Sequence, residues 1–130
     1  VSTFIEEVAR LTGPQRLFRI ATRDVEIEGA QIRKGEWVAL FFGSANHDPA
    51  VFPDPGRLDL DRPNIRQHMA FGHGLHFCLG APLARLEVFA VVNAVLDRYS
   101  VIAPSDEPAE RQTASLLTNG FVRLPLRLAR

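Results

Sequence analysis

The stretch FGHGLHFCLG, from Phe71 to Gly80, decides how the rest of this chain is interpreted. It holds the only cysteine, two of the four histidines and three of the nine glycines of the 130-residue chain. A thiol is a strong ligand or nucleophile as the thiolate, which a helix N-terminus stabilises. Cys78 lies just ahead of a predicted helix, and its neighbouring glycines let the backbone approach a flat ligand closely. These residues favour one rigidly held sulfur that donates to a metal.

Residue chemistry alone leaves other interpretations of Cys78 open. A lone cysteine is most often a small buried hydrophobe, and it can also serve as a catalytic nucleophile. His73, His76 and Cys78 would supply three ligands to zinc, although a fourth ligand and the paired cysteines usual in structural zinc sites are lacking. A covalent c-type heme is excluded, because the C-x-x-C-H pattern does not occur.

The composition is that of an ordinary globular domain. Hydrophobic residues make up 46% and charged residues 23%, and the 15 basic residues match the 15 acidic ones. We therefore expect no nucleic-acid partner and no membrane partner, and neither a membrane span nor a signal peptide is visible. A single cysteine fits a reducing cytoplasm. Because the chain starts at Val1 and its only methionine is Met69, we expect it to be a piece of a longer protein.

The hydrophobic pattern predicts an α+β chain. A helix is expected over 3–12, with Thr3 and Glu6 as a capping box. Branched and aromatic residues then predict a small, mostly antiparallel sheet, and a run of prolines predicts an irregular meander. The predicted segments are a short helix (1–14), a β unit (15–42), a proline-rich meander (43–70), the cysteine loop (71–80), a long helix (81–99) and a terminal β region (100–130).

The long helix has an unusual distribution of apolar residues. Over 81–98 they cover most of its circumference, which is typical of a helix buried on several sides. The rest of the chain offers few elements that could cover it. This is a second reason to expect that part of the protein lies outside the chain.

Four separate stretches resemble one known family. The pattern F-x-x-G-x-x-x-C-x-G is matched by Phe71, Gly74, Cys78 and Gly80. It resembles the heme-binding loop of the cytochrome P450 superfamily. The stretch EEVAR supplies E-x-x-R, as in the family's helix K, and FPDPGRLDLDR resembles the segment before the heme loop; LFRIATRDVEI and HDPAVFPDP look like the soluble bacterial branch. The resemblance covers nearly all of residues 1–130, but only the C-terminal third of such a protein.

The resemblance implies heme b as the cofactor. Cys78 would be the axial thiolate ligand of the iron, and Phe71 would pack beside the ring and the sulfur. His76 and Arg19 would bind the heme propionates, and the backbone N–H groups after the cysteine would turn toward the sulfur and tune its charge. His73 is expected to have no ligand role. The predicted cofactor-binding residues are Cys78, His76, Arg19, Phe71, Gly72, Leu79 and Gly80.

The resemblance also implies a structural network. Glu7 and Arg10 lie three residues apart on one helix, a spacing at which a solvated pair contributes a few tenths of a kcal/mol. In the family such a pair is buried with a further arginine, here expected to be Arg57, and ties the helix to the meander. We expect no catalytic residue in this chain, because the family's oxygen-activating acid–alcohol pair has no match.

The parent protein is accordingly expected to be a bacterial-type heme-thiolate monooxygenase. Such an enzyme inserts one oxygen atom from O₂ into a small organic substrate, with electrons from a ferredoxin-type redox partner. The chain alone is expected to be inactive. Two alternatives stay open: a heme-free module that self-associates, and a small zinc-binding domain. A zinc site would leave the positions of Phe71, Glu7, Arg10 and Arg57 unexplained.

Overall fold

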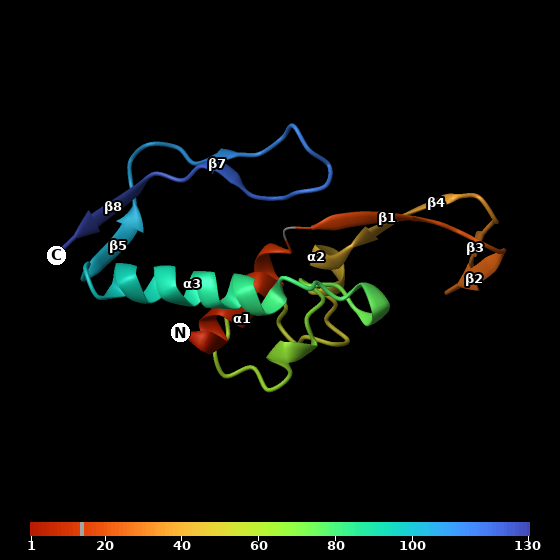
Figure 1. Ribbon diagram of the computed structural model, residues 1–130, viewed down its shortest axis with the longest axis horizontal. Helices are drawn as coiled ribbons and strands as arrows, with labels where there is room; N and C mark the ends of the chain where they lie inside the picture. The colour runs from red at the N-terminus through yellow and green to blue at the C-terminus, as the bar shows by residue number, and fades with distance from the viewer. Residues whose placement is uncertain (14) are drawn as a thin grey trace.

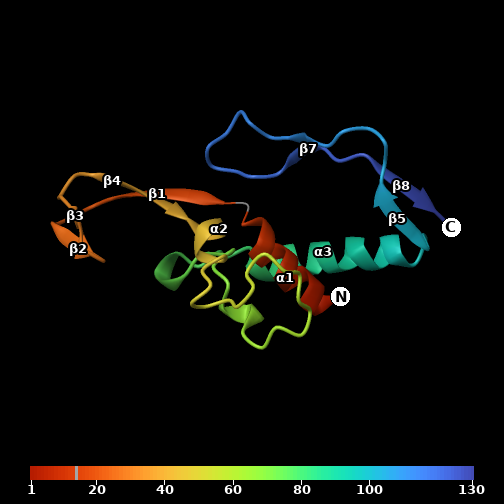
Figure 2. The same cartoon turned by 180° about the vertical axis from the view of Figure 1, so that it is seen from behind.

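Two packed helices lie between two β regions (Figure 1). The computed structural model describes residues 1–13 and 15–130. Helix α3 (Ala81–Leu96) crosses the middle of the molecule, and α1 (Ser2–Thr12) packs against it. The same view from behind shows one β ribbon extending beyond the start of α3 and a second β region beside its end (Figure 2). The molecule is therefore elongated.

The first β region consists of two separate antiparallel pairs. Strand β1 (Arg16–Ile20) pairs with β4 (Trp37–Phe41), and β2 (Val25–Ile27) pairs with β3 (Ala30–Ile32). Gly29 has a φ of 82°, which supports the tight turn between β2 and β3. The antiparallel strands predicted for this stretch are present.

The terminal β region is more divided than the sequence indicated. Pro125 lies between β7 (Phe121–Arg123) and β8 (Leu126–Ala129). Proline has no N–H to donate to a strand ladder, so the pairing breaks there. The partners of these two strands were not predicted: β7 pairs with β6 (Glu110–Arg111), and β8 pairs with β5 (Val101–Pro104).

The meander and the cysteine loop contain only short helical turns. These are α2 (Phe42–Ala45), η1 (Ile65–Gln67) and η2 (Gly74–His76). The meander packs against α1, and the apolar core lies where these segments meet the start of α3. The buried hydrophobic residues are Ile5, Phe52, Ile65, Ala70 and Ala81.

Helix α1 begins differently from the prediction. It starts at Ser2 and has no side-chain cap, so the predicted capping box of Thr3 and Glu6 is wrong. The carboxylate of Glu6 instead accepts hydrogen bonds from His68 and Arg85, which are supplied by other parts of the fold. Tertiary partners have displaced the local cap.

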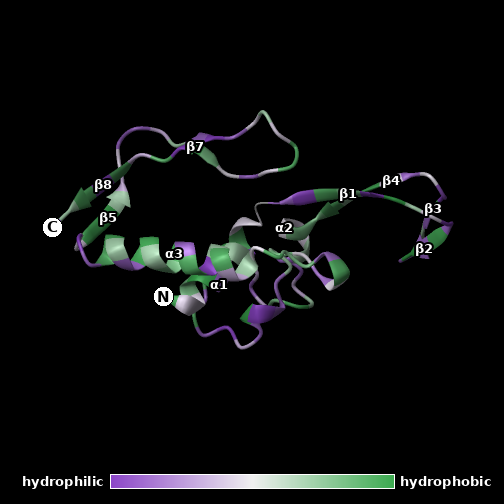
Figure 3. Ribbon diagram, viewed as in Figure 1, coloured by the Kyte–Doolittle hydropathy of each residue, from purple (hydrophilic) through white to green (hydrophobic). Residues whose placement is uncertain are grey.

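Helix α3 confirms the predicted helix but leaves much of its apolar surface uncovered. Leu83, Leu86 and Val91 are 59%, 63% and 62% exposed, and Figure 3 shows hydrophobic residues along the helix. The expectation that this helix is buried on several sides does not hold in the structure, where only its first residue, Ala81, is buried. No helix in the described part of the chain is both long and apolar enough to cross a membrane.

Candidate functional site

A cavity of about 900 Å³ lies between the β1–β4 ribbon and the cysteine loop. This volume lies within the range usual for cofactor and small-molecule sites. Its polar groups include the thiol of Cys78 and the basic side chains of Arg19, His73 and His76. The rest of its lining is mostly apolar, with Leu17, Ala39, Leu40, Phe41, Phe42, Ala45, Met69, Ala70, Phe71 and Ala84.

The cysteine loop is closed by a backbone hydrogen bond. The N–H of Cys78 donates to the carbonyl oxygen of Phe71 at 2.9 Å. Between them, Gly72 and Gly74 have φ values of 74° and 71°, a region that favours glycine. The thiol of Cys78 is exposed and lies three residues before α3, where the helix dipole favours a negative charge.

The last two residues of the loop differ from the prediction. Leu79 is 97% exposed, and neither it nor Gly80 lines the cavity. Gly80 has ordinary backbone angles, and a Cβ there would lie 3.7 Å from Cys78 Sγ. The N–H of Ala81, expected to point toward the sulfur, donates to the carbonyl oxygen of Cys78 at 3.2 Å. The first N–H group of α3 therefore binds the backbone carbonyl of Cys78 and not its sulfur.

The tertiary structure brings five of the seven predicted cofactor-binding residues to one cavity. Arg19 comes from β1, where Leu17, two residues earlier on the same face of the strand, also lines the cavity. The other four, Phe71, Gly72, His76 and Cys78, come from the loop. His73, for which no role was predicted, also lines the cavity.

A buried ion pair holds α1 to the meander. The side chains of Glu7 and Arg10 are fully buried, and the guanidinium donates to both carboxylate oxygens at 2.8 and 2.7 Å. Arg10 also donates to the carbonyl oxygens of Asn46, Pro55 and Arg57, at 2.8, 2.7 and 3.2 Å. A buried charge is tolerated when it is paired and hydrogen-bonded in this way. The pair therefore ties α1 to the meander.

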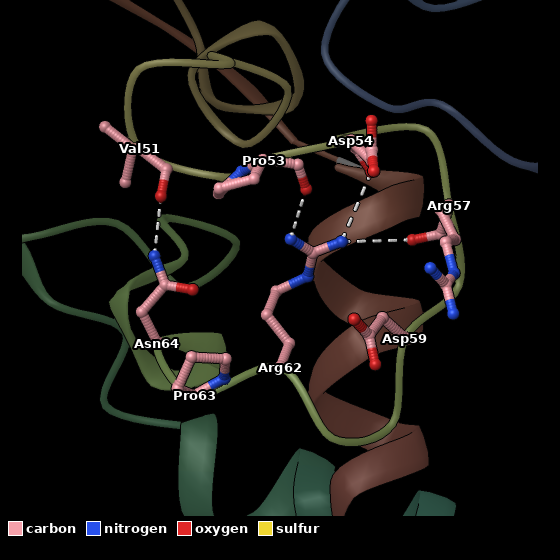
Figure 4. Close-up of a pocket in the computed structure, with 8 residues that line it drawn as sticks. All are labelled: Val51, Pro53, Asp54, Arg57, Asp59, Arg62, Pro63 and Asn64. Atoms are coloured by element: carbon pink, nitrogen blue, oxygen red, sulfur yellow. Dashed lines mark hydrogen bonds between the residues drawn. The ribbon is translucent and has the colours of Figure 1, made fainter.

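The second arginine of this network is Arg62, and the prediction of Arg57 is wrong. Figure 4 shows the Arg62 guanidinium directed at the carbonyl oxygens of Pro53, Asp54 and Arg57, with donor distances of 2.7, 3.3 and 3.3 Å. Arg62 Nε also donates to Glu7 Oε1 at 3.2 Å. The side chain of Arg57 is exposed, because the meander turns its carbonyl inward.

The network keeps Glu7 ionised. Burial by itself raises the pKa of this carboxyl, but hydrogen bonds from Arg10, from the N–H of Asp59 and from Arg62 outweigh that effect. Together they lower the pKa from 4.5 to about 2. The carboxyl of Glu7 on α1 is therefore ionised near neutral pH, where it faces the meander.

A second network lies beside the cavity, and the sequence reasoning missed it. The carboxylate of Glu6 accepts from His68 Nε2 at 2.8 Å and from Arg85 Nε and Nη2 at 2.6 and 3.0 Å. The guanidinium of Arg85 lies 4.5 Å from the centroid of the Phe71 ring. Burial raises the pKa of Glu6, and the hydrogen bonds from Arg85 and His68 lower it overall. The only sequence signal was one arginine near the start of a mostly apolar helix.

The described residues give no support to a zinc site. Across 1–13 and 15–130, no three histidine, cysteine, aspartate or glutamate residues lie close enough together to hold a metal ion.

Comparison with known proteins agrees with this arrangement. The family model described as cytochrome P450 matches residues 1–128. The chain belongs to the cytochrome P450 family. Among its relatives is a putative cytochrome P450 140 of Mycobacterium tuberculosis, 44% identical over 125 residues that cover 95% of this chain and 28% of that protein. Another is the 6-deoxyerythronolide B hydroxylase of Saccharopolyspora erythraea, 39% identical over 95% of this chain and 31% of that protein.

Solved P450 structures share the fold as well. The substrate-free cytochrome P450 CYP150A6 of Mycobacterium marinum superimposes with a TM-score of 0.92 at 34% identity. The match covers 99% of this P450 chain and 34% of that structure. The mixed helix and sheet architecture is therefore that of part of a P450 fold, and the chain spans about a third of the length of the P450 proteins it matches.

Proposed function

We propose that this P450 chain is the proximal heme-binding part of a monooxygenase that inserts one oxygen atom from O₂ into an organic substrate. The observation that carries the proposal is the exposed thiol of Cys78 in a mostly apolar cavity of about 900 Å³. The residues present fit heme b: a soft thiolate donor, apolar walls for a flat ring, and Arg19 and His76 for its two carboxylates.

Each residue has a distinct role in this proposal. Cys78 would ligate the iron, and a bound heme would supply the chemistry that activates O₂, favoured by electron density from the thiolate. Arg19 and His76 would bind the anionic propionates. Phe71 and the other apolar residues of the lining would exclude water from the sulfur, which strengthens its interactions with charged and polar groups.

The partners follow from the same chemistry. The parent protein would need O₂, a small organic substrate and electrons from a ferredoxin-type redox protein, and a reducing cytoplasm would suit its single cysteine. The chain alone would lack full activity, because no acid–alcohol pair for oxygen activation is recognised in its sequence.

A carbon monoxide difference spectrum tests the proposal. Heme is added to the purified chain, the protein is reduced, and carbon monoxide is introduced. We expect a Soret band at the position of thiolate-ligated heme, lost in Cys78→Ser because an alcohol is a poor ligand for this iron. His73→Ala serves as the control and should retain the band. An absence of heme uptake by the folded chain contradicts heme binding by this chain, although not its family membership.

One observation favours the second candidate, a heme-free chain that self-associates. Apolar residues of α3, including Leu83, Leu86 and Val91, are exposed. Large exposed apolar patches are typical of interaction surfaces. The double variant L83E/L86E should therefore shift the heme-free chain from oligomer to monomer in size-exclusion chromatography with light scattering. A monomeric unmodified chain would exclude self-association.

A further inference from the structure

Two adjacent glutamates of α1 belong to different networks. Glu7 faces Arg10 and Arg62 and holds the meander, whereas Glu6 faces His68 and Arg85 and lies next to the cysteine loop. The Glu6 side chain is 10% exposed, so its charge is held mainly by these partners. The meander network stabilises the fold, which leaves the role of the Glu6 network to be explained.

The first partner, His68, makes a hydrogen bond at each of its two ring nitrogens. The backbone N–H of Ala70 donates to Nδ1 at 3.2 Å, and a backbone N–H can only donate. Nδ1 therefore carries no proton, and the proton on Nε2 is donated to Glu6 at 2.8 Å. The ring of His68 lies 6.0 Å from that of Phe71. Glu6 thus fixes a ring that neighbours the first residue of the cysteine loop.

The second partner connects Glu6 to the same phenylalanine. Arg85 donates to both carboxylate oxygens at 2.6 and 3.0 Å, a bidentate geometry that fixes the plane of the guanidinium. The Cζ atom of Arg85 lies 4.5 Å from the centroid of the Phe71 ring, where a cation is attracted to the ring. The carbonyl oxygen of Phe71 in turn accepts the N–H of Cys78. A continuous path of contacts leads from Glu6 to the cysteine.

We propose that Glu6 is a positioning residue for Cys78, acting through Arg85 and Phe71 on the loop that presents the thiol. Its carboxylate holds the Arg85 guanidinium and the His68 ring at Phe71, and the Phe71 carbonyl closes the loop. The sulfur is thereby kept in one orientation at the cavity. Only the identity of the group that the thiol binds rests on the proposed function. The positioning of the thiol does not depend on it and is tested without heme.

The test measures how fast iodoacetamide alkylates Cys78 in the heme-free 130-residue chain at one fixed pH. As Cys78 is the only cysteine, the reaction reports on this site alone. In Glu6→Gln the bidentate ion pair is lost and the loop is released, so alkylation should become about threefold faster or more. Glu87→Gln is the matched control, because Glu87 is an exposed glutamate two residues after Arg85, and its rate should be unchanged.

A double variant separates positioning from a general loss of stability. In the background Phe71→Leu the path is cut, so adding Glu6→Gln should leave the alkylation rate within about 1.5-fold of that of Phe71→Leu alone. Free energies of unfolding are measured for every variant in parallel. If Glu6→Gln fails to fold, Arg85→Lys replaces it, because lysine keeps the charge but lacks the planar fork. The side chain of Arg85 is 36% exposed, which makes that variant tolerable.

The outcomes are distinct. Faster alkylation that requires Phe71 supports the inference, whether or not the chain takes up heme. Glu6→Gln that lowers the free energy of unfolding without changing the alkylation rate overturns it and leaves Glu6 a purely structural role. An equal acceleration in both backgrounds also overturns it, because the effect then does not pass through Phe71.

Discussion

Two arginines five residues apart in the meander have different roles. Arg62 places its guanidinium among three carbonyl oxygens and the carboxylate of Glu7, whereas Arg57 contributes only its carbonyl oxygen. Both lie in a stretch that resembles the family's segment before the heme loop, so sequence position alone does not separate them. The inward turn of the backbone at Arg57 decides which guanidinium is buried.

This difference predicts contrasting effects of two alanine substitutions. Arg62→Ala leaves Glu7 and the meander carbonyl oxygens short of donors, and it should lower the free energy of unfolding by about 3 kcal/mol. Arg57→Ala removes only exposed atoms and should change it by less than about 0.5 kcal/mol. Urea denaturation of both variants measures this, and equal effects would show that the network has been assigned to the wrong arginine.

At the scale of elements, the end of α1 is in close contact with the start of α2. Gly13 caps α1 with a φ of 43°, and a Cβ built on it would lie 2.3 Å from the Cα of Gly43. No side chain can occupy that space unless the backbone moves. The close approach thus brings the E-x-x-R helix against α2, whose Phe42 and Ala45 line the cavity.

Gly13→Ala should therefore destabilise the fold more than the same substitution at another glycine with positive φ. We expect Gly13→Ala to lower the free energy of unfolding by more than about 2 kcal/mol, from backbone strain and the clash together. Gly29→Ala is the control, with a φ of 82° and no atom within 4 Å, and should lose only about 1 kcal/mol from backbone strain. Similar losses in thermal or urea unfolding would argue against the clash.

Helix α3 and the cysteine loop form one structural unit. Pro82 at the first turn suits the missing donors of a helix start, and Arg85, one turn into α3, joins Glu6 to Phe71. The same helix therefore presents Cys78 at its N-terminus and connects the cysteine loop to α1. Much of the remainder of α3 consists of exposed apolar residues.

At the scale of the whole molecule, much of the buried interior is ionic. The buried hydrophobic residues are few, and Glu7, Arg10 and Arg62 lie among the most buried side chains. Stability should consequently depend on pH more strongly than in a domain held mainly by apolar packing. Folding of this chain requires charged groups to find their partners across the helix and the meander.

The pH dependence has a definite sign. The pKa of Glu7 falls from 4.5 to about 2 on folding, so the folded state favours the ionised carboxyl. Its stabilisation is complete above about pH 5 and is lost as the pH falls toward 2, by roughly 3 kcal/mol in all. The lowered pKa of Glu6 acts in the same direction. Free energies of unfolding near neutral pH and at about pH 3 measure the loss.

Glu7→Gln provides the control for this prediction. The variant should be less stable near neutral pH, because a neutral amide replaces the carboxylate that binds Arg10 and Arg62. It should also show a smaller change on acidification, since one titrating group with a lowered pKa has been removed. The same loss in the variant and in the unmodified chain would place the pH dependence elsewhere.

The sequence by itself determined the local features of this protein. Spacing within ten residues identified the cysteine loop, a long run of mostly apolar residues identified the long helix, and alternation with turn residues identified the first β strands, because all three depend on neighbours along the chain. The separation of Glu7 and Arg10 by three residues was also sufficient to predict a pair on one helix face.

Only the tertiary structure decided which distant groups meet. It selected Arg62 over Arg57, joined Glu6 to His68 and Arg85, and divided the terminal region at Pro125 into strands with separate partners. It also brought Arg19 from β1 to the cavity of Cys78. The physical reason is that a buried charge or an open strand edge needs a hydrogen-bonding partner. The fold decides which group lies close enough to be that partner, and proximity in sequence does not.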